Sequence, residues 1–433
     1  MKKIITIKEY ESFCTVRNAN GYKYLDDATF NQLERFILEN SNKDTDALDL
    51  MGISVKKNVG KVITAKNFVG IIMMKNGTTI EILPKIHSNT GYTDNQVKEL
   101  LIKMLKTLKN SPFKSLQSAN LNITTMNVFE IFIRMFLDEV FLIVKHGLKC
   151  NYEKVQDNLG VVKGKIIFNK HIQLNHSHKE RCYSEFDVFN TNRPENKLLK
   201  TTLEYLYKQS SSMKNKTDIK TLLSSFSDVD ASTDYKKDFD KCVVDRNMKD
   251  YEKALVWAKI FLQGKSFTSF SGSKVAQALL FPMETLFESY IAAKFKKELD
   301  LNQYSISAQD KSYYLFERNF RLRPDIVIRN KPKKITFVMD TKWKVLSDKK
   351  HNYGISQADM YQMYAYQKKY NAETITLLYP LTDDVSNKDI SFKSNDGVIV
   401  NIRFLDLFDI NNSIKSVVKE ITGTDDDLSE NLI

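Results

Sequence analysis

Two aspartates and a lysine in the last third of the sequence have the types and the spacing of a metal-dependent hydrolytic site. Asp325 and Asp340 lie on two apolar segments that a basic turn joins, so a hairpin would bring their carboxylates together. In a strand, residues i and i+2 share a face, so Asp340 and Lys342 project together while Thr341 turns away and leaves its backbone carbonyl available as a ligand. Two carboxylates and a carbonyl suit Mg²⁺, or Mn²⁺, and Lys342 can orient or deprotonate a water whose pKa the metal lowers. The pattern predicts metal-assisted hydrolysis of a phosphate ester.

Each of these residues also has a simpler interpretation. Asp325 follows a proline and can be a turn residue, while Asp340 and Lys342 can form a surface ion pair. What favours catalysis is the position of Asp340, which closes a very apolar run at the C-terminal end of its strand, where α/β sheets place their sites.

The spacing of the acidic residues resembles a known nuclease signature. Pro324-Asp325, fourteen further residues and Asp340-x-Lys342 match the pattern of the PD-(D/E)XK nuclease superfamily. The resemblance implies that Glu288, on the helix that precedes the strands, is an additional catalytic carboxylate and metal ligand. A glutamate on a polar helix stripe can equally be solvated.

A second element of the same resemblance follows the hairpin. Gln362 and Tyr366 lie four residues apart, so they share one face of the helix predicted there. They resemble the QxxxY motif that RecB-like members of the superfamily use beside the active site, which implies that they shape the site. A pair on the helix surface is the alternative.

Three arginines are candidates for contacts with a DNA backbone. Arg318, Arg321 and Arg323 lie in an aromatic and basic run at 311–323, and arginines commonly bind phosphate oxygens. A strand with alternating core aromatics is the competing interpretation.

The elements around these residues predict an α+β protein of several domains. We expect a β-rich and helical region at 1–150, with a hairpin around Asn76-Gly77, and a mixed strand and helical connecting region at 151–270. Within the latter, the Ser-, Lys- and Asp-rich segment 210–240 predicts a surface connection between helices. The last region, 271–433, is expected to form the α/β PD-(D/E)XK core. Its predicted order is helix 282–299, strands around 315–329 and 335–342, helix 356–370, and strands 374–379 and 398–404.

Composition limits the class of protein. The 433 residues include 65 Lys and Arg against 53 Asp and Glu, a formal charge of +12, which suits a polyanionic partner such as DNA. Four cysteines without a CxxC pair indicate neither a disulfide scaffold nor a zinc ribbon, which fits the cytoplasm. The most apolar stretch, 126–148, carries too many charges for a membrane span.

A resemblance to one family extends over most of the chain. Five blocks occur in the order seen in the McrC family, the nuclease subunit of McrBC-type restriction systems: 69–86, 160–165, 185–200, 246–251 and 281–288. One departure is Lys163-Gly164-Lys165, where the family pattern would have Arg-Gly-Arg, so the positive charge is kept but bidentate pairing is not.

This resemblance implies a Mg²⁺-dependent DNA endonuclease that works with a hexameric AAA+ GTPase resembling McrB and stimulates its hydrolysis. The N-terminal region, 1–150, would dock in the pore of that partner. The sequence has no GxxxxGK[ST] motif, so nucleotide binding has to come from a partner. Two other functions stay open: a non-catalytic adaptor that activates the motor, and a stand-alone nuclease of the same fold.

Overall fold

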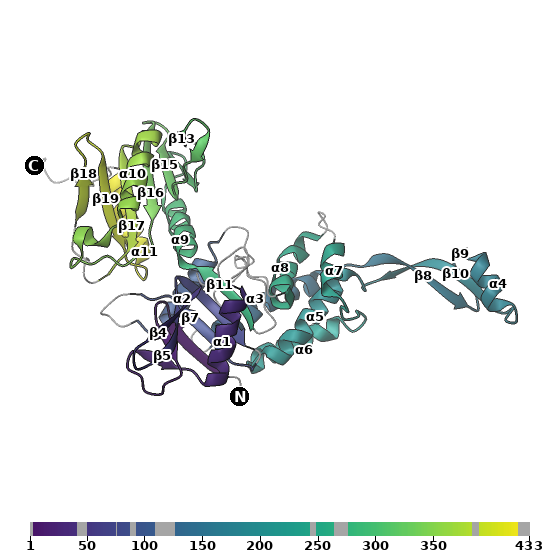
Figure 1. Cartoon of the computed structure of the whole chain (residues 1–433). Helices are drawn as coiled ribbons and strands as arrows, with labels where there is room; N and C mark the ends of the chain where they lie inside the picture. Colours follow the sequence, from purple (N-terminus) through teal and green to yellow (C-terminus); the bar gives the residue numbers. More distant parts are fainter. Residues whose placement is uncertain are drawn as a thin grey trace, which may run out of the picture. The chain divides into compact units, whose positions relative to one another are not determined.

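The chain divides into two compact units, and residues from both of its ends share one of them. The computed structural model describes residues 3–40, 50–74, 76–86, 92–108, 126–242, 248–263, 276–382 and 389–422. The first unit comprises Met1–Val128 and Ser266–Ile433, and the second comprises Phe129–Lys265 (Figure 1). The first break lies at 128 and not at the predicted 150, the second lies within five residues of the predicted 270, and the two outer regions form one unit where separate domains were expected.

The first unit begins with a sheet that joins the two ends of the chain. Its strands run in the order β1-β7-β6-β11. They are β1 (Ile4–Lys8), β7 (Thr79–Leu83), β6 (Phe68–Met74) and β11 (Ala276–Pro282). β6 and β7 form the hairpin predicted around Asn76-Gly77.

Strand β11 explains why the C-terminal region shares a unit with the N-terminal region. It pairs antiparallel with β6 and places Leu280 opposite Gly70. Gly70 has φ +134°, and a Cβ atom there would lie 2.1 Å from the carbonyl oxygen of Leu279, so only glycine allows this close approach. The apolar side chains of β11 are buried in the N-terminal sheet, so residues 271–433 do not form a separate domain.

A second sheet completes the N-terminal part of this unit. Its order is β3-β2-β5-β4, with β3 (Tyr22–Tyr24), β2 (Ser12–Cys14), β5 (Gly60–Ala65) and β4 (Met51–Lys56). Helix α1 (Asp27–Asn40) supplies Phe30, Leu33 and Phe36 to one buried cluster that both sheets share. Helix α2 (Asp94–Leu105) begins at a capping box formed by Thr93 and Gln96.

A six-stranded sheet carries the predicted site residues. Its order is β12-β15-β16-β17-β19-β18. The strands are β12 (Tyr304–Ala308), β15 (Ile326–Asn330), β16 (Ile335–Thr341), β17 (Thr374–Pro380), β19 (Ile399–Leu405) and β18 (Ile390–Lys393). β15 and β16 form the predicted antiparallel hairpin, and β16, β17 and β19 run parallel.

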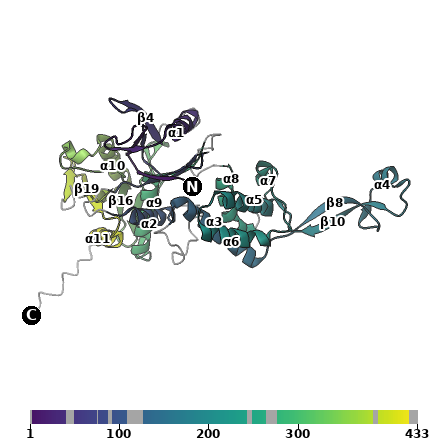
Figure 2. The ribbon, with the colours of Figure 1, turned by 90° about the horizontal axis from the view of Figure 1, so that it is seen from below.

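Helices cover both faces of this sheet. Helix α10 (Gln357–Tyr370) packs on one face, and α9 (Met283–Glu298) and α11 (Ile410–Thr422) lie together on the other (Figure 2). On the α10 face, Val338 and Leu377 join Met363 and Tyr366 in a single buried cluster. Side chains alternate along a strand, so Asp340 shares the α10 face with Val338.

The second unit is a helical body with a projecting hairpin. Its helices are α3 (Val128–His146), α5 (Pro194–Gln209), α6 (Met213–Ser225), α7 (Tyr235–Lys241) and α8 (Lys249–Gln263). The expectation of a surface connection at 210–240 is wrong, because Ser212 caps α6 and the helix buries Ile219 and Leu222. None of the helices in the described parts of the chain is long and apolar enough to cross a bilayer.

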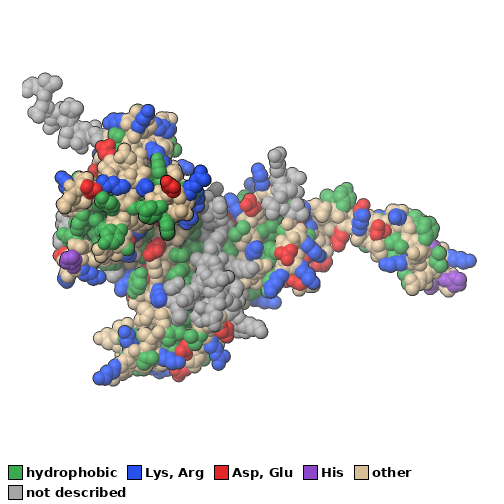
Figure 3. Space-filling model, turned by 45° about the horizontal axis from the view of Figure 1, so that its top comes forward, with side chains coloured by type: hydrophobic (Ala, Val, Ile, Leu, Met, Phe, Trp, Pro, Cys, Tyr) green, Lys and Arg blue, Asp and Glu red, His purple; other side chains and the backbone are tan. Residues whose placement is uncertain are grey.

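The projecting part, which we call the arm, comprises residues 151–190 (Figure 1). Strand β8 (Asn151–Leu159) pairs along its whole length with β10 (Cys182–Asn190), and β9 (Lys165–Ile166) and α4 (Phe168–Asn175) lie between them in sequence. Lys163 of the family block lies over the ring of Phe186. Large apolar side chains on the arm are exposed (Figure 3), namely Tyr152, Val161, Val162, Phe168, Ile172, Leu174 and Phe189.

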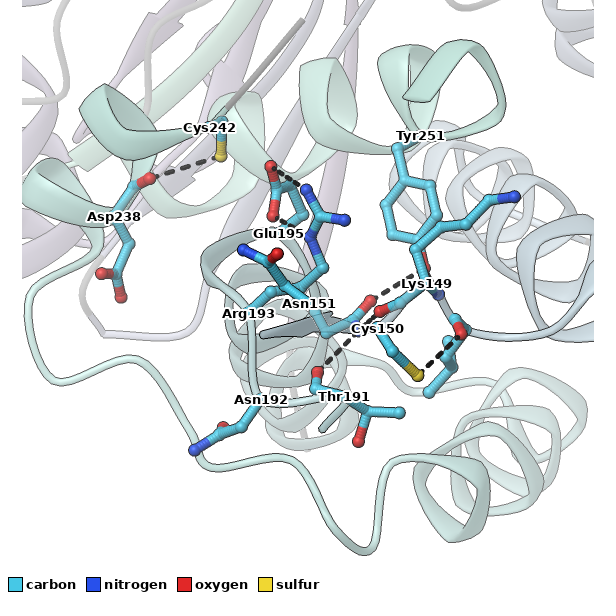
Figure 4. A network of polar contacts seen from close by, with 12 residues as sticks. Lys149, Cys150, Asn151, Thr191, Asn192, Arg193, Glu195, Asp238, Cys242 and Tyr251 are labelled. Carbon is cyan, nitrogen blue, oxygen red and sulfur yellow. Dashed lines mark hydrogen bonds and ion pairs between the residues drawn. The ribbon is translucent and has the colours of Figure 1, made fainter. Parts of the chain in front are cut away.

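A hydrogen-bond network holds the arm where it leaves the helical body. The Nδ2 group of Asn196, which is fully buried, donates to the carbonyls of Lys149 and Thr191, so one side chain binds both ends of the arm. The hydroxyl of Tyr251 donates to Asn196 Oδ1 and accepts from the Lys149 N–H. Lys149, Thr191 and Tyr251 of this network are labelled in Figure 4. Asn196 and Tyr251 belong to two of the family blocks, and residues 246–247 of the second block lie outside the described residues.

Candidate active site at the end of strand β16

The hairpin of β15 and β16 brings the two predicted aspartates together. Ile326 pairs with Met339, and one more step in this register places Asp325 opposite Asp340. Asp325 Oδ2 accepts hydrogen bonds of 2.7 Å from both the backbone N–H and the hydroxyl of Thr341. These two bonds fix the orientation of the Asp325 carboxylate. Asp340 is 2% exposed.

Burial and like charge act on both carboxylates. The pKa of Asp325 is raised, first by burial and then by the negative charge of Glu288. The pKa of Asp340 is also raised, first by burial and then by Asp325. Clustered carboxylates that repel one another in this way are stabilised by a cation.

The donor set fits a cation that retains water. Within the described ranges, no group of three or more His, Cys, Asp or Glu side chains has the arrangement of a complete metal site. The candidate ligands are the two carboxylates and the Thr341 carbonyl that the sequence predicts. Mg²⁺ usually binds through one or two carboxylates and keeps several waters, so a pair of carboxylates is compatible with it.

Lys342 faces this pair. Its Nζ lies 2.7 Å from Asp340 Oδ2 and 3.5 Å from Asp359 Oδ1. Burial opposes the charge of Lys342, but the two carboxylates outweigh it and the pKa is raised. Lys342 is thus protonated at neutral pH and acts as a hydrogen-bond donor.

The predicted helix pair connects to this lysine. Lys342 Nζ donates to Gln362 Oε1 over 3.2 Å, and Gln362 Nε2 donates to the Tyr366 hydroxyl over 2.7 Å. Tyr366 is buried among apolar side chains of the sheet. The structure therefore links Lys342, Gln362 and Tyr366 by hydrogen bonds, which run from the buried Tyr366 to Lys342 at the site.

Sequence reasoning missed Asp359. This buried residue lies in the first turn of α10 and also binds Lys344, whose Nζ lies 2.9 Å from Asp359 Oδ2. Burial would raise its pKa, but hydrogen bonds from Ser356 and Lys344 lower it. Its position three residues before Gln362 on the same helix face was the signal in the sequence.

Glu288 and the arginines lie at the edge of this group. The charge of Glu288 acts on Asp325, but its carboxylate accepts a hydrogen bond from Gln309 Nε2 over 3.0 Å. Arg318, Arg321 and Arg323 are all exposed, and Arg321 stacks on Tyr314.

The expectation of a core strand at 311–323 is wrong. These residues form a small hairpin, β13 (Tyr314–Phe316) with β14 (Asn319–Arg321), that pairs with no other strand among the described residues. Phe316 and Phe320 are 63% and 74% exposed. Aromatic and basic side chains therefore share one exposed hairpin.

Comparisons with known proteins agree with this description. The family model described as "McrBC 5-methylcytosine restriction system component" matches residues 63–380. In a refined half-complex of Thermococcus gammatolerans McrB AAA+ hexamers with bound McrC, one chain has the same fold with a TM-score of 0.69. That chain is 18% identical, and the alignment covers 97% of this chain and 100% of that one. The cryo-EM structure of the Thermococcus gammatolerans McrBC complex gives a TM-score of 0.49 at 18% identity, over 69% and 88% of the two chains.

No curated protein matches the sequence. The family model nevertheless spans more than half of the chain and includes both aspartates and the lysine of the candidate site. The chain therefore belongs to the family of McrBC 5-methylcytosine restriction system components.

Proposed function

We propose that this protein is the DNA endonuclease subunit of a McrBC-like restriction system and that it hydrolyses phosphodiester bonds with Mg²⁺. The observation that carries the proposal is the cluster of Asp325, Asp340 and Lys342. A buried carboxylate, Asp340, and a half-buried one, Asp325, both have raised pKa values and meet a protonated lysine at the end of β16. Two carboxylates that repel each other do not stabilise the fold, but together with a lysine they are suited to bind a cation and a phosphate.

Each residue has a role in this reaction. Asp325, Asp340 and the Thr341 carbonyl would hold Mg²⁺, or Mn²⁺ in its place, and Glu288 supplies a further carboxylate beside Asp325. When bound, the ion lowers the pKa of a water and neutralises charge on the phosphate. Lys342 donates hydrogen bonds that orient the attacking water and stabilise phosphate oxygens. Gln362 fixes the ammonium group of Lys342, and Tyr366 fixes the Gln362 amide.

Catalysis is tested with an isosteric substitution. Asp340→Asn should lower cleavage of methylated duplex about a thousand-fold, since metal-ion catalysis contributes several kcal/mol. The assay contains the full chain, its AAA+ partner, GTP and Mg²⁺. The matched control is Glu373→Gln, an exposed carboxylate just before β17, which should cut like the wild type. Equal cutting by Asp340→Asn and wild type would overturn the proposal in favour of a non-catalytic adaptor.

The proposal includes a AAA+ GTPase partner. The chain lacks a phosphate-binding loop motif of its own, and the similar chain of known structure is bound to McrB AAA+ hexamers. We infer that the arm, and not region 1–150, contacts this partner. The N-terminal sheets bury their apolar side chains in a shared cluster, whereas the arm exposes seven large apolar residues. Exposed apolar surface of this kind marks an interaction site.

A further inference from the structure

A cavity with a net positive lining adjoins the candidate active site. It has a volume of about 420 Å³, within the range of ligand pockets. Lys85, Lys344 and Lys350 line it, together with aromatic and apolar residues that include Tyr10 and Trp343. None of its described lining residues is acidic. Lys344 is paired with Asp359, so the charges that favour an anionic ligand in this cavity are chiefly those of Lys85 and Lys350.

The cavity begins immediately beyond the catalytic lysine. Lys344 follows Lys342 by two residues, so their Cα atoms are at most about 7 Å apart. Both ammonium groups contact the same carboxylate, since Asp359 lies 3.5 Å from Lys342 Nζ and 2.9 Å from Lys344 Nζ. An anion in the cavity would therefore lie next to the group that is cut.

Two walls of the cavity are held by one buried carboxylate. Glu9 Oε2 accepts hydrogen bonds from the Lys85 N–H over 3.0 Å and from the Trp343 indole N–H over 3.2 Å. The Trp343 ring also packs against Phe287 with a centroid distance of 5.3 Å. Burial raises the pKa of Glu9 to about 8, so this carboxyl group is largely neutral at pH 7 and does not cancel the charge of the lysines.

The third lysine is accommodated by a glycine. Gly354 has φ +84°, and a Cβ atom there would lie 3.1 Å from Lys350 Cδ. A larger residue would push the Lys350 stem away from this wall. Both the backbone conformation and the space at position 354 thus favour glycine.

We propose that this cavity binds a backbone phosphate of the DNA strand beside the scissile phosphodiester. Lysines bind phosphates as point charges and read no base, which suits a cut that is positioned by the backbone. The exposed ring of Tyr10 offers a face to the adjoining sugar or base. The inference deepens the proposed function and rests on it. A free nucleotide phosphate has the same chemistry, so the test must separate the two ligands.

The test measures DNA binding over a salt series. Full-length Lys85→Gln/Lys350→Gln is compared with wild type by fluorescence anisotropy on a short duplex, without divalent metal so that no strand is cut. Each lost phosphate contact should lower the slope of log K against log salt by about 0.9. We expect the slope to fall by an amount equivalent to one or two lost phosphate contacts, and the affinity to fall several-fold. Lys350→Gln alone, at an exposed position, keeps the test valid if the double variant does not fold.

The control changes two charges elsewhere on the same sheet and helix layer. Lys393→Gln/Lys419→Gln replaces two exposed lysines outside the cavity and should keep the wild-type slope. The cavity proposal is overturned if the Lys85/Lys350 variant also keeps the wild-type salt slope. It is also overturned if guanosine monophosphate binds wild type, does not bind the variant and leaves DNA binding of both unchanged.

The two proposals fail in different ways. If the wild type cuts DNA with its partner but the cavity variant binds with an unchanged salt slope, the cavity proposal fails and the nuclease proposal stands. If the salt slope of the cavity variant falls as expected but the wild type does not cut DNA with its partner, DNA binding at the cavity stands and the nuclease proposal fails.

Discussion

The active-site hairpin and the arm are both antiparallel pairs of strands, but they are supported in opposite ways. β15 and β16 lie inside a six-stranded sheet with helices on both faces, and most of their side chains are buried. β8 and β10 form a long ribbon whose side chains are mostly exposed or half-buried. An isolated two-stranded ribbon is at best marginally stable in water. Chemistry that needs fixed geometry therefore lies in the sheet, while the surface suited to a partner lies on a ribbon without a core of its own.

The strongest test of this contrast separates activity from stability in the sheet. Asp325→Asn should lower DNA cleavage about a thousand-fold, because metal-ion catalysis contributes several kcal/mol. The same change should raise the metal-free melting temperature, since it removes a half-buried charge that repels its neighbours. The measurements are cleavage with partner, GTP and Mg²⁺, and thermal unfolding in chelator. A variant that loses both activity and stability would mean that Asp325 is chiefly structural.

A second test addresses the buried link between the N-terminal sheet and the end of β16. Because burial raises the pKa of Glu9 from 4.5 to about 8, its contribution to stability is complete below about pH 4.5. That contribution is lost as the pH rises to about 8. Glu9→Gln should remove this loss, which is on the order of a few kcal/mol. Denaturant unfolding across this pH range measures it, and parallel curves for variant and wild type would contradict the assignment.

A third test addresses the exposed side of the comparison. Phe168→Ser/Ile172→Ser on helix α4 should change the free energy of unfolding by less than about 0.5 kcal/mol, because both side chains are exposed. It should weaken stimulation of the partner GTPase by at least about tenfold, since burying each side chain contributes roughly 1.5 kcal/mol or more. Val55→Ser, at an exposed position of β4, is the control. Full stimulation of the GTPase by the α4 variant would show that the partner does not bind this part of the arm.

The smallest expected effect concerns the exposed hairpin of β13 and β14. Arg321→Gln should lower the salt slope of DNA binding by about one and weaken affinity a few-fold, equally for all sequences. The stacking of Arg321 on Tyr314 holds it at the surface. Arg403→Gln is not a suitable control because Arg403 pairs with Asp389 and Glu420, so Lys393→Gln serves instead. An unchanged salt slope would show that Arg321 on this hairpin does not contact the DNA backbone.

Much of the active-site sheet was predictable because its signals are local. The helix predicted at 282–299 is observed as Met283–Glu298, and the hairpin around the basic turn forms and brings Asp325 beside Asp340. The contact of Lys342 with Asp340 follows from strand periodicity, and the contact of Gln362 with Tyr366 follows from helix periodicity. Local pattern was sufficient for these residues.

The errors arose where distant segments meet. Nothing in the sequence near β11 indicates that its partner is β6, and Glu9 binds an indole 334 residues away. Periodicity reports which face of an element is apolar but not which other element covers it. Helix α6 was missed for a different reason, since its Ser- and Lys-rich composition conceals a narrow apolar face.

The pairing of β11 with β6 has a consequence for synthesis of the chain. Phe68 pairs with Pro282, so the first sheet cannot be completed until 214 more residues have left the ribosome. At about 5–20 residues per second this takes roughly 10–40 seconds. During that interval one edge of β6 is without its partner strand, and an open strand edge is a site of aggregation. The newly made N-terminal sheet must therefore persist in an incomplete form, and until β11 emerges its open edge is a site that a chaperone could protect.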